Sequence, residues 1–134
     1  MMGKGHCHCG AVRYEFDGKP VKASYCHCSL CRRLTGSAFG AYCEVPSKDL
    51  RWSGGENLRK YNITERYVVS FCGTCGAPLA VTQSLWPDAT YLLMGALEED
   101  SGVTPQYHIF TGSKAPWFEI HDSLPQYERW REDA

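Results

Sequence analysis

Apolar and charged residues alternate near the start of the chain in the pattern of a half-buried β-strand. Val12, Tyr14 and Phe16 are apolar, whereas Arg13 and Glu15 between them are charged. Alternation with a period of two places the apolar side chains on one face of a strand. Similar strand-like runs occupy residues 21–25, 37–45, 58–61, 66–71, 79–82 and 90–97. The pattern therefore predicts a mainly β fold.

The segments between these runs carry turn and helix signals. A turn is expected at residues 17–20, which read Asp-Gly-Lys-Pro, and one helical turn at residues 29–34, which Gly36 would end. Residues 98–105 form an acidic segment typical of a loop, and the aromatic residues from Tyr107 onward are expected to pack back on the sheet. The sequence has no internal repeat, low-complexity tract or linker, so a single domain over residues 1–134 is predicted.

Composition supports a packed domain and argues against several classes of protein. Hydrophobic residues make up 43% of the 134 residues, which is enough for a core without disulfide staples. The formal net charge is −1 and the longest basic run is the pair Arg32–Arg33, so nucleic acid is not an expected partner. No apolar run approaches the roughly 20 residues of a membrane span, and the N-terminus has no signal-peptide pattern. A cytoplasmic protein without a membrane partner is expected.

Eight cysteines carry the candidate chemistry of the chain. Seven fall into tight clusters and one is isolated: Cys7-x-Cys9, Cys26-x-Cys28-x-x-Cys31, Cys72-x-x-Cys75, and Cys43 alone. Thiols stay reduced in the cytosol, and such spacing is typical of metal sites rather than of a disulfide framework. We therefore predict zinc as the cofactor, in two sites per chain. The isolated Cys43 lies in an apolar run and is expected to be a small buried residue.

Two of the clusters suit a closed structural site. Residues 72–76 read Cys-Gly-Thr-Cys-Gly, and the glycines allow a sharp turn that points both thiolates at one ion. The side chains of Cys7 and Cys9 share a face of an extended segment and can lean onto one metal. Together these four thiolates would bind zinc with no room for a substrate, and they would join distant parts of the chain.

The central cluster suits a catalytic site. Cys26, Cys28 and Cys31 can reach one zinc, and three protein ligands with an exchangeable fourth position are the arrangement of catalytic zinc. A fourth protein ligand would instead close the site, and the candidates are Cys43, His27, His6, His8, His108 and His121. His27 is a poor candidate because alternation points its side chain away from its two cysteine neighbours. The spacing also leaves open other groupings of the seven clustered cysteines.

Three ordered cysteine motifs resemble those of the glutathione-dependent formaldehyde-activating family, also called the CENP-V/GFA domain. The opening motif is GHCHCGAVRY at residues 5–14, the second is CHCSLCRRLTG at 26–36, and the third is FCGTCG at 71–76. The segments KAPW at 114–117 and DSLP at 122–125 are similar to the family's C-terminal signature. The resemblance runs from about residue 5 to residue 127, which would be the core of the domain.

The resemblance implies a single antiparallel β domain, tent-like in outline, with zinc-binding cysteine loops. It implies a structural zinc on Cys7, Cys9, Cys72 and Cys75 and a catalytic zinc on Cys26, Cys28 and Cys31. It further implies a carbon–sulfur lyase or synthase that joins a small aldehyde such as formaldehyde to glutathione or a similar thiol. The reaction would be that of an S-(hydroxymethyl)glutathione synthase.

Residues beside the central cluster are candidates for substrate contacts. Arg32 and Arg33 directly follow the last ligand and can bind the carboxylates of a glutathione-like substrate. Adjacent arginines need not face the same way, so both can instead be surface charges. Trp52, Trp86 and Trp117 are expected to pack in the core or at its rim rather than to line a substrate site.

Two other functions compete with the enzyme. In the first, both zincs are structural and the domain is a non-enzymatic interaction module, as the chromosome- and cytoskeleton-associated relatives suggest. Those relatives would carry an additional basic segment, and this sequence has none. In the second, the central cluster serves thiol redox chemistry or metal handling. The enzyme is the preferred interpretation, although one fold can host several chemistries.

Overall fold

The structure of the chain is a computed structural model that describes residues 2–98 and 101–131. Its elements follow one another as β1 (Met2–His6), β2 (Arg13–Asp17), β3 (Lys22–Cys26), α1 (Ser29–Thr35), β4 (Gly40–Pro46), β5 (Leu50–Ser53), β6 (Leu58–Asn62), β7 (Tyr67–Cys72), β8 (Pro78–Gln83), β9 (Ala89–Leu93) and β10 (His108–Ile109). Short 3₁₀ turns lie at Ser47–Asp49, Gly55–Asn57, Met94–Ala96 and Thr111–Ser113. The predicted mainly β fold is confirmed.

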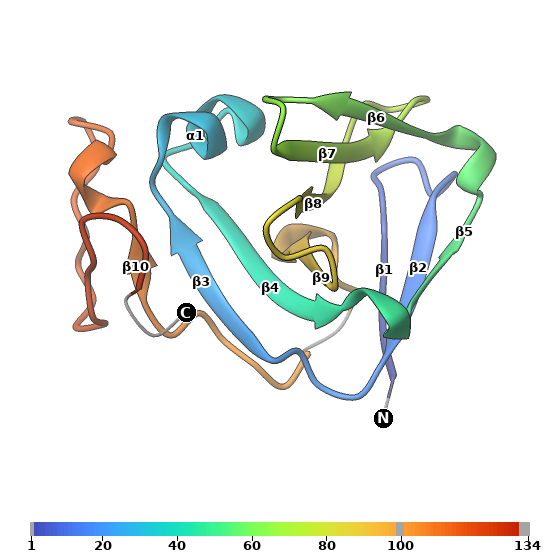
Figure 1. Ribbon diagram of the computed structural model, residues 1–134, viewed down its shortest axis with the longest axis horizontal. Helices are drawn as coiled ribbons and strands as arrows, with labels where there is room; N and C mark the ends of the chain where they lie inside the picture. The colour runs from blue at the N-terminus through green and yellow to red at the C-terminus, as the bar shows by residue number, and fades with distance from the viewer. Residues whose placement is uncertain (1, 99–100, 132–134) are drawn as a thin grey trace.

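The strands form two sheets (Figure 1). The smaller has the order β1-β2-β5, and the larger has the order β10-β3-β4-β9-β8-β7-β6. Neighbouring strands are antiparallel except β10, which runs parallel to β3 through the pairs His108–Tyr25 and Ile109–Cys26. The antiparallel domain is therefore confirmed, with one short parallel edge.

The two sheets pack on each other through the alternating residues that the sequence pattern identifies. Tyr14 and Phe16 of β2 are almost fully buried, as is Val12 just before the strand. Residues of the larger sheet belong to the same core cluster, among them Cys43 and Val45 of β4. The isolated Cys43 is thus a buried small side chain in the core.

The opposite face of the larger sheet carries a second cluster that includes Tyr42 and Ile109. The segment after β10 returns to this side of the sheet, where the ring of Phe110 lies 4.9 Å from that of Trp130 and the ring of Tyr107 lies 6.0 Å from that of Tyr127. These C-terminal aromatic residues therefore pack back on the sheet, whereas Trp117 is exposed and does not.

Several boundaries differ from those that the sequence pattern predicts. The run at 37–45 becomes a strand only from Gly40, and the run at 90–97 ends as a strand at Leu93, where a 3₁₀ turn follows. The strands β1, β5 and β10 have no counterpart among the predicted runs. The helix Ser29–Thr35 matches the helical turn predicted at residues 29–34, and Gly36 ends it in the left-handed region at φ 66°.

Part of the acidic loop at 98–105, residues 99–100, lies outside the described residues. Within the described part of the chain, no helix has the length and apolar character needed to span a bilayer.

Candidate metal centres

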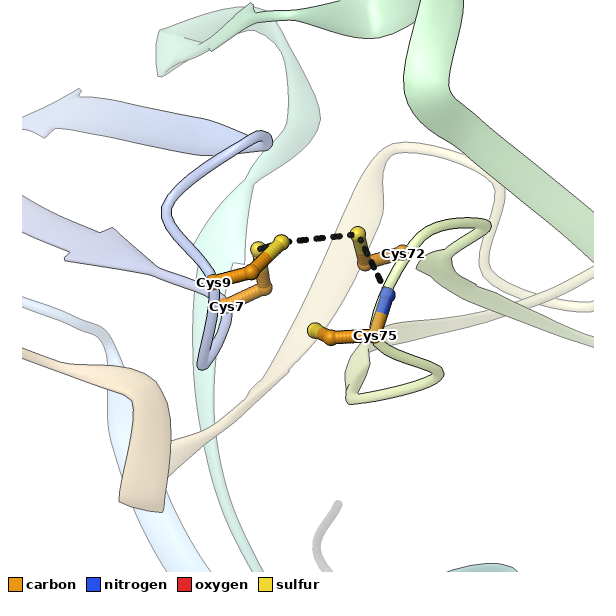
Figure 2. A group of neighbouring side chains, drawn as sticks. All are labelled: Cys7, Cys9, Cys72 and Cys75. Atoms are coloured by element: carbon orange, nitrogen blue, oxygen red, sulfur yellow. Dashed lines mark hydrogen bonds between the residues drawn. The ribbon is translucent and has the colours of Figure 1, made fainter.

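Four cysteines from the two sheets meet at one point (Figure 2). Cys7 and Cys9 lie in the turn between β1 and β2, Cys72 is the last residue of β7, and Cys75 follows it in the next turn. The Sγ atoms of Cys7 and Cys9 are 3.7 Å apart, and those of Cys9 and Cys72 are 3.8 Å apart. All four sulfurs lie within 4.8 Å of one another. The structure thus brings together two segments more than sixty residues apart in sequence.

The backbone around Cys72 favours the thiolate form of its side chain. Sγ of Cys72 accepts hydrogen bonds from the backbone N–H groups of Thr74 at 3.3 Å and Cys75 at 3.4 Å. The bond from Cys75 is the main cause that lowers the pKa of the Cys72 thiol to about 6. Gly76, with φ 81°, completes the turn by donating its N–H to the carbonyl of Cys72 at 2.8 Å. A side chain would be strained at that φ, which explains the glycine.

The spacing of the four sulfurs fits a zinc ion. Tetrahedral zinc with Zn–S bonds of about 2.3 Å requires sulfur–sulfur distances of about 3.8 Å. The 3.7 and 3.8 Å separations match this value. Because the two pairs belong to different sheets, an ion held here would connect the smaller sheet to the larger one.

The central cysteines form a second cluster at the start of α1. Cys26 ends β3, Cys28 is the N-cap of the helix, and Cys31 lies in its first turn. The cap bond is donated by the N–H of Cys31 to Sγ of Cys28 at 3.3 Å. All three Sγ atoms lie within 4.8 Å of one another. The hydroxyl of Tyr42, on the neighbouring strand β4, donates a hydrogen bond of 3.3 Å to Sγ of Cys31.

Three thiols so close together cannot all ionise without a cation. Hydrogen bonds from Cys26 and Cys31 lower the pKa of the Cys28 thiol to about 3. Hydrogen bonding to Cys28 and Cys31, followed by burial, strongly raises the pKa of Cys26. The cluster therefore holds one negative charge readily and resists further ones, because like charges repel in a partly buried site. A divalent cation would remove this obstacle, so the donor set also fits a metal.

Within residues 2–98 and 101–131, no further cysteine, histidine or carboxylate joins the three central sulfurs. Among the sequence candidates, Cys43 lies in the core between the sheets. His27 points away from its cysteine neighbours, as the alternation predicts, and its Nε2 lies 2.8 Å from Nδ1 of His108. The side chain of His121 is 81% exposed and pairs with Glu119. The cluster thus offers three protein ligands.

Behind the central cluster lies a hydrogen-bonded chain that sequence reasoning missed. Nε2 of His108 lies 3.0 Å from the carboxylate of Asp122, and its Nδ1 faces His27. The ring of His27 is fully buried and packs at a tilt against Phe39 and Phe118, whose ring centroids lie 5.4 and 6.3 Å away. Burial, followed by the nearby His108, lowers the pKa of His27 to about 4. No short-range motif links these residues: the parallel pairing of β10 with β3 brings His108 beside His27, and the segment after β10 supplies Asp122.

The central cluster opens on a cavity of about 710 Å³. Its walls include all three central cysteines and a set of aromatic side chains: Tyr42, Tyr67, Trp86, Tyr91, Tyr107, Phe110 and Trp130. Trp86 therefore lines the cavity, which corrects the expectation that it only packs in the core or at its rim. Trp52 packs on Tyr14 in the core as expected, whereas Trp117 is 69% exposed and packs in neither place.

The two arginines after the central cluster lie on α1 but are not among the residues that line the cavity. Arg33 is exposed and Arg32 is half-buried. Nε of Arg32 is buried and has no hydrogen-bond partner in the described part of the chain. Their contact with a substrate stays a prediction.

Comparison with known proteins places this architecture in one family. Residues 2–113 match the family model described as glutathione-dependent formaldehyde-activating enzyme. A Halomonas elongata protein that carries this enzyme's name provisionally is 31% identical over 130 residues, which cover 90% of this chain and 82% of the relative. The crystal structure of a Rhodobacter sphaeroides protein is similar with a TM-score of 0.62 and 33% identity, covering 72% of this chain and 89% of that one. The chain belongs to the glutathione-dependent formaldehyde-activating enzyme family.

Proposed function

We propose that this protein is a zinc-dependent carbon–sulfur lyase or synthase that adds glutathione, or a similar thiol, to formaldehyde or another aldehyde. The product is an S-hydroxyalkyl adduct. Membership of the family supports a thiol and an aldehyde as substrates. The observation that carries the proposal is the three-sulfur cluster, which lacks a fourth protein ligand in the described chain and lies in a cavity wall.

In this proposal the two clusters have different roles. Cys7, Cys9, Cys72 and Cys75 hold a structural zinc, because four thiolates complete its tetrahedron. Cys26, Cys28 and Cys31 hold a catalytic zinc, which leaves one position for a substrate. A zinc ion bound there supplies Lewis acidity, which lowers the pKa of a bound thiol or polarises a carbonyl oxygen.

The protein's own side chains prepare this site. Burial raises the pKa of Tyr42, so its hydroxyl stays protonated and keeps donating to Sγ of Cys31. The apolar walls limit water near the sulfurs, which strengthens electrostatic interactions there. Arg32 and Arg33 are proposed to bind substrate carboxylates, which requires a thiol that reaches beyond the cavity onto α1.

Exchange NMR with the zinc-loaded protein tests the reaction. Formaldehyde and glutathione are mixed at equilibrium with their adduct, and the exchange rate is measured with and without protein. A rate well above the uncatalysed one is expected, and Cys28→Ser should return it to background while the protein stays folded. Exchange at the background rate with the wild-type chain would reject the lyase.

Metal counting separates the enzyme from the interaction module. Native mass spectrometry should find two zinc ions in the wild type and one in Cys28→Ser. Two ions retained in that variant would mean that Cys28 is not a ligand. Two ions in the wild type with background exchange would favour the module in which both zincs are structural.

A further inference from the structure

The three central sulfurs come from two elements that meet at one residue. Cys26 is the last residue of β3, whereas Cys28 caps α1 and Cys31 lies in its first turn. His27 is the only residue between the strand and the helix cap. The chain runs from β3 directly into α1 (Figure 1), so the backbone conformation of His27 sets where the helix sulfurs lie relative to the strand sulfur.

The helix gains little of its position from core packing. α1 has seven residues, and none of them is buried. A helix this short is marginal without tertiary packing, so its place depends strongly on the segments that join it to the fold. Tetrahedral zinc requires sulfur–sulfur distances of about 3.8 Å, so even a small rotation of α1 would separate Cys28 and Cys31 from Cys26. The geometry of the metal site therefore depends on the junction between strand and helix.

The backbone and the side chain of His27 are both held at this junction. The backbone N–H donates a hydrogen bond of 3.0 Å to the carbonyl of Ile109, and Nε2 of the ring lies 2.8 Å from Nδ1 of His108. The ring also packs against Phe39 and Phe118. Because two consecutive residues of β10 bind it at two points, His27 has little freedom to change its backbone angles.

The strand β10 is held in turn by a segment near the C-terminus. The backbone N–H of His108 donates to the carbonyl of Pro125 at 2.9 Å, and its carbonyl accepts from the N–H of Tyr127 at 2.9 Å. Nε2 of the same residue lies 3.0 Å from the carboxylate of Asp122. Residues 122–127 therefore fix the backbone and the ring of His108, and through that ring they fix the residue between the metal-ligand candidates.

We propose that His27 is a positioning residue for the zinc of the central cluster, and that His108 and Asp122 hold it in place. The hydrogen-bonded chain fixes the angle between β3 and α1, so that the three sulfurs stay within 4.8 Å of one another. Ligands held in this way bind a metal more tightly, because less conformational freedom is lost on binding. The inference rests on the zinc site of the proposed function but on no step of the reaction.

Zinc affinity tests the inference without any catalysis. Competition with a chromophoric chelator measures the more weakly held ion in the wild type and in His27→Phe, which keeps a ring but loses the nitrogen that faces His108. The affinity of this variant should fall about tenfold or more, as for other residues that orient metal ligands. His27→Gln restores an N–H donor at a similar distance from the backbone and should recover most of the loss. A role of the ring in packing alone predicts the opposite order, because only Phe keeps the ring.

A second pair of variants tests the far end of the chain, where the side chain of Asp122 is 42% exposed and its replacement should leave the protein folded. Asp122→Ala should lower the zinc affinity roughly threefold, a fraction of what one hydrogen bond contributes. Asp122→Asn keeps an acceptor for Nε2 of His108 and should retain the wild-type affinity. Glu119→Ala is the matched control, because this exposed carboxylate pairs with the exposed His121 at 3.6 Å. Equal affinities for Asp122→Ala and Glu119→Ala would overturn the role of Asp122.

Cadmium NMR distinguishes a local effect from a general one. With ¹¹³Cd in both clusters, His27→Phe should shift the signal of the central ion and leave that of the four-cysteine cluster unchanged. The second signal also shows that each variant is folded. Shifts at both clusters, an unchanged affinity in His27→Phe, or a weaker affinity in His27→Gln than in His27→Phe would overturn the inference.

The outcome for the metal site is separate from the outcome for the reaction. Background exchange of formaldehyde and glutathione in the wild type, together with the expected affinities, would reject the lyase and support the positioning role. Catalysis by the wild type, together with an unchanged affinity in His27→Phe, would keep the lyase and overturn the positioning role.

Discussion

Nε2 of His27 lies 2.8 Å from Nδ1 of His108, and this contact fixes how protons are arranged behind the central cysteines. Nε2 of His108 faces the carboxylate of Asp122 at 3.0 Å. A carboxylate only accepts, so Nε2 of His108 donates to Asp122, and Nδ1 is an acceptor when the ring carries a single proton. His27 must then donate from Nε2, which leaves its buried Nδ1 as a lone pair without a partner in the described chain. The contact with His108 therefore orients the ring of His27, which lies in sequence between the candidate metal ligands Cys26 and Cys28.

Both histidines should therefore be Nε2–H tautomers at neutral pH. Long-range ¹H–¹⁵N correlation spectra of the zinc-loaded protein report the protonation of each ring nitrogen. Asp122→Ala removes the acceptor and should allow His108 to exchange between tautomers, which broadens its signals. A protonated Nδ1 on His27 in the wild type would contradict the direction of the chain.

Removing the donor of His27 should destabilise the fold. His27→Phe keeps a ring beside Phe39 and Phe118 but leaves Nδ1 of His108 buried without a partner, at a cost of about 1–3 kcal/mol. For a domain of this size the melting temperature should fall by roughly 5–15 °C in calorimetry of the zinc-loaded protein. The exposed His121 provides the control, because His121→Phe should change the melting temperature by only about a degree or two. Equal melting temperatures for the two variants would refute this role.

The hydroxyl of Tyr42 should tune the metal affinity of the central cluster. Tyr42→Phe removes the 3.3 Å bond to Sγ of Cys31 and keeps the ring in the cavity wall. Loss of such an outer hydrogen bond typically weakens metal binding by about tenfold or more. Competition with a chromophoric chelator measures this change for the more weakly held zinc ion. Tyr91→Phe makes the same change elsewhere in the cavity and should leave the affinity unaltered, so a similar loss in both variants would point to a general effect.

The cysteine spacing predicts the metal-binding motifs, because the cysteines of each motif are close in sequence. It leaves open how the motifs group into two clusters, because Cys7 and Cys9 lie more than sixty residues from Cys72 and Cys75. The cavity and the hydrogen-bonded chain of His27, His108 and Asp122 depend on contacts between distant segments, so no local sequence pattern predicts them. Periodicity fails to predict strand β1 for a different reason: its sequence, MGKGH, has no alternation of apolar and polar residues. Its glycines lie under aromatic rings of β2: a Cβ on Gly3 would fall 2.0 Å from Cζ of Phe16, and one on Gly5 would fall 2.3 Å from Cζ of Tyr14. The apolar cover of that strand comes from its neighbour.

Loss of one sulfur from the four-cysteine cluster should unfold the protein. A structural zinc contributes on the order of 10–16 kcal/mol in zinc-finger peptides, which is comparable to the total stability of a domain, about 5–15 kcal/mol. Cys72→Ser should therefore lose cooperative thermal unfolding. Cys43→Ala is the matched control, since Cys43 is equally buried but lies outside both clusters, and it should cost only about 1–2 kcal/mol. A normal melting curve for Cys72→Ser would show that this cluster does not hold the two sheets together.

Graded chelation should release the two metal ions in a set order. The central cluster supplies three sulfurs and lines an open cavity, whereas the other supplies four, so the central ion should leave first. A fluorescent zinc indicator should report two phases, and circular dichroism should change only in the second, when the connection between the sheets is lost. Cys28→Ser should lack the first phase and keep the second. Unfolding during the first phase would mean that the central ion is structural as well, and the division of roles between the two clusters would have to be abandoned.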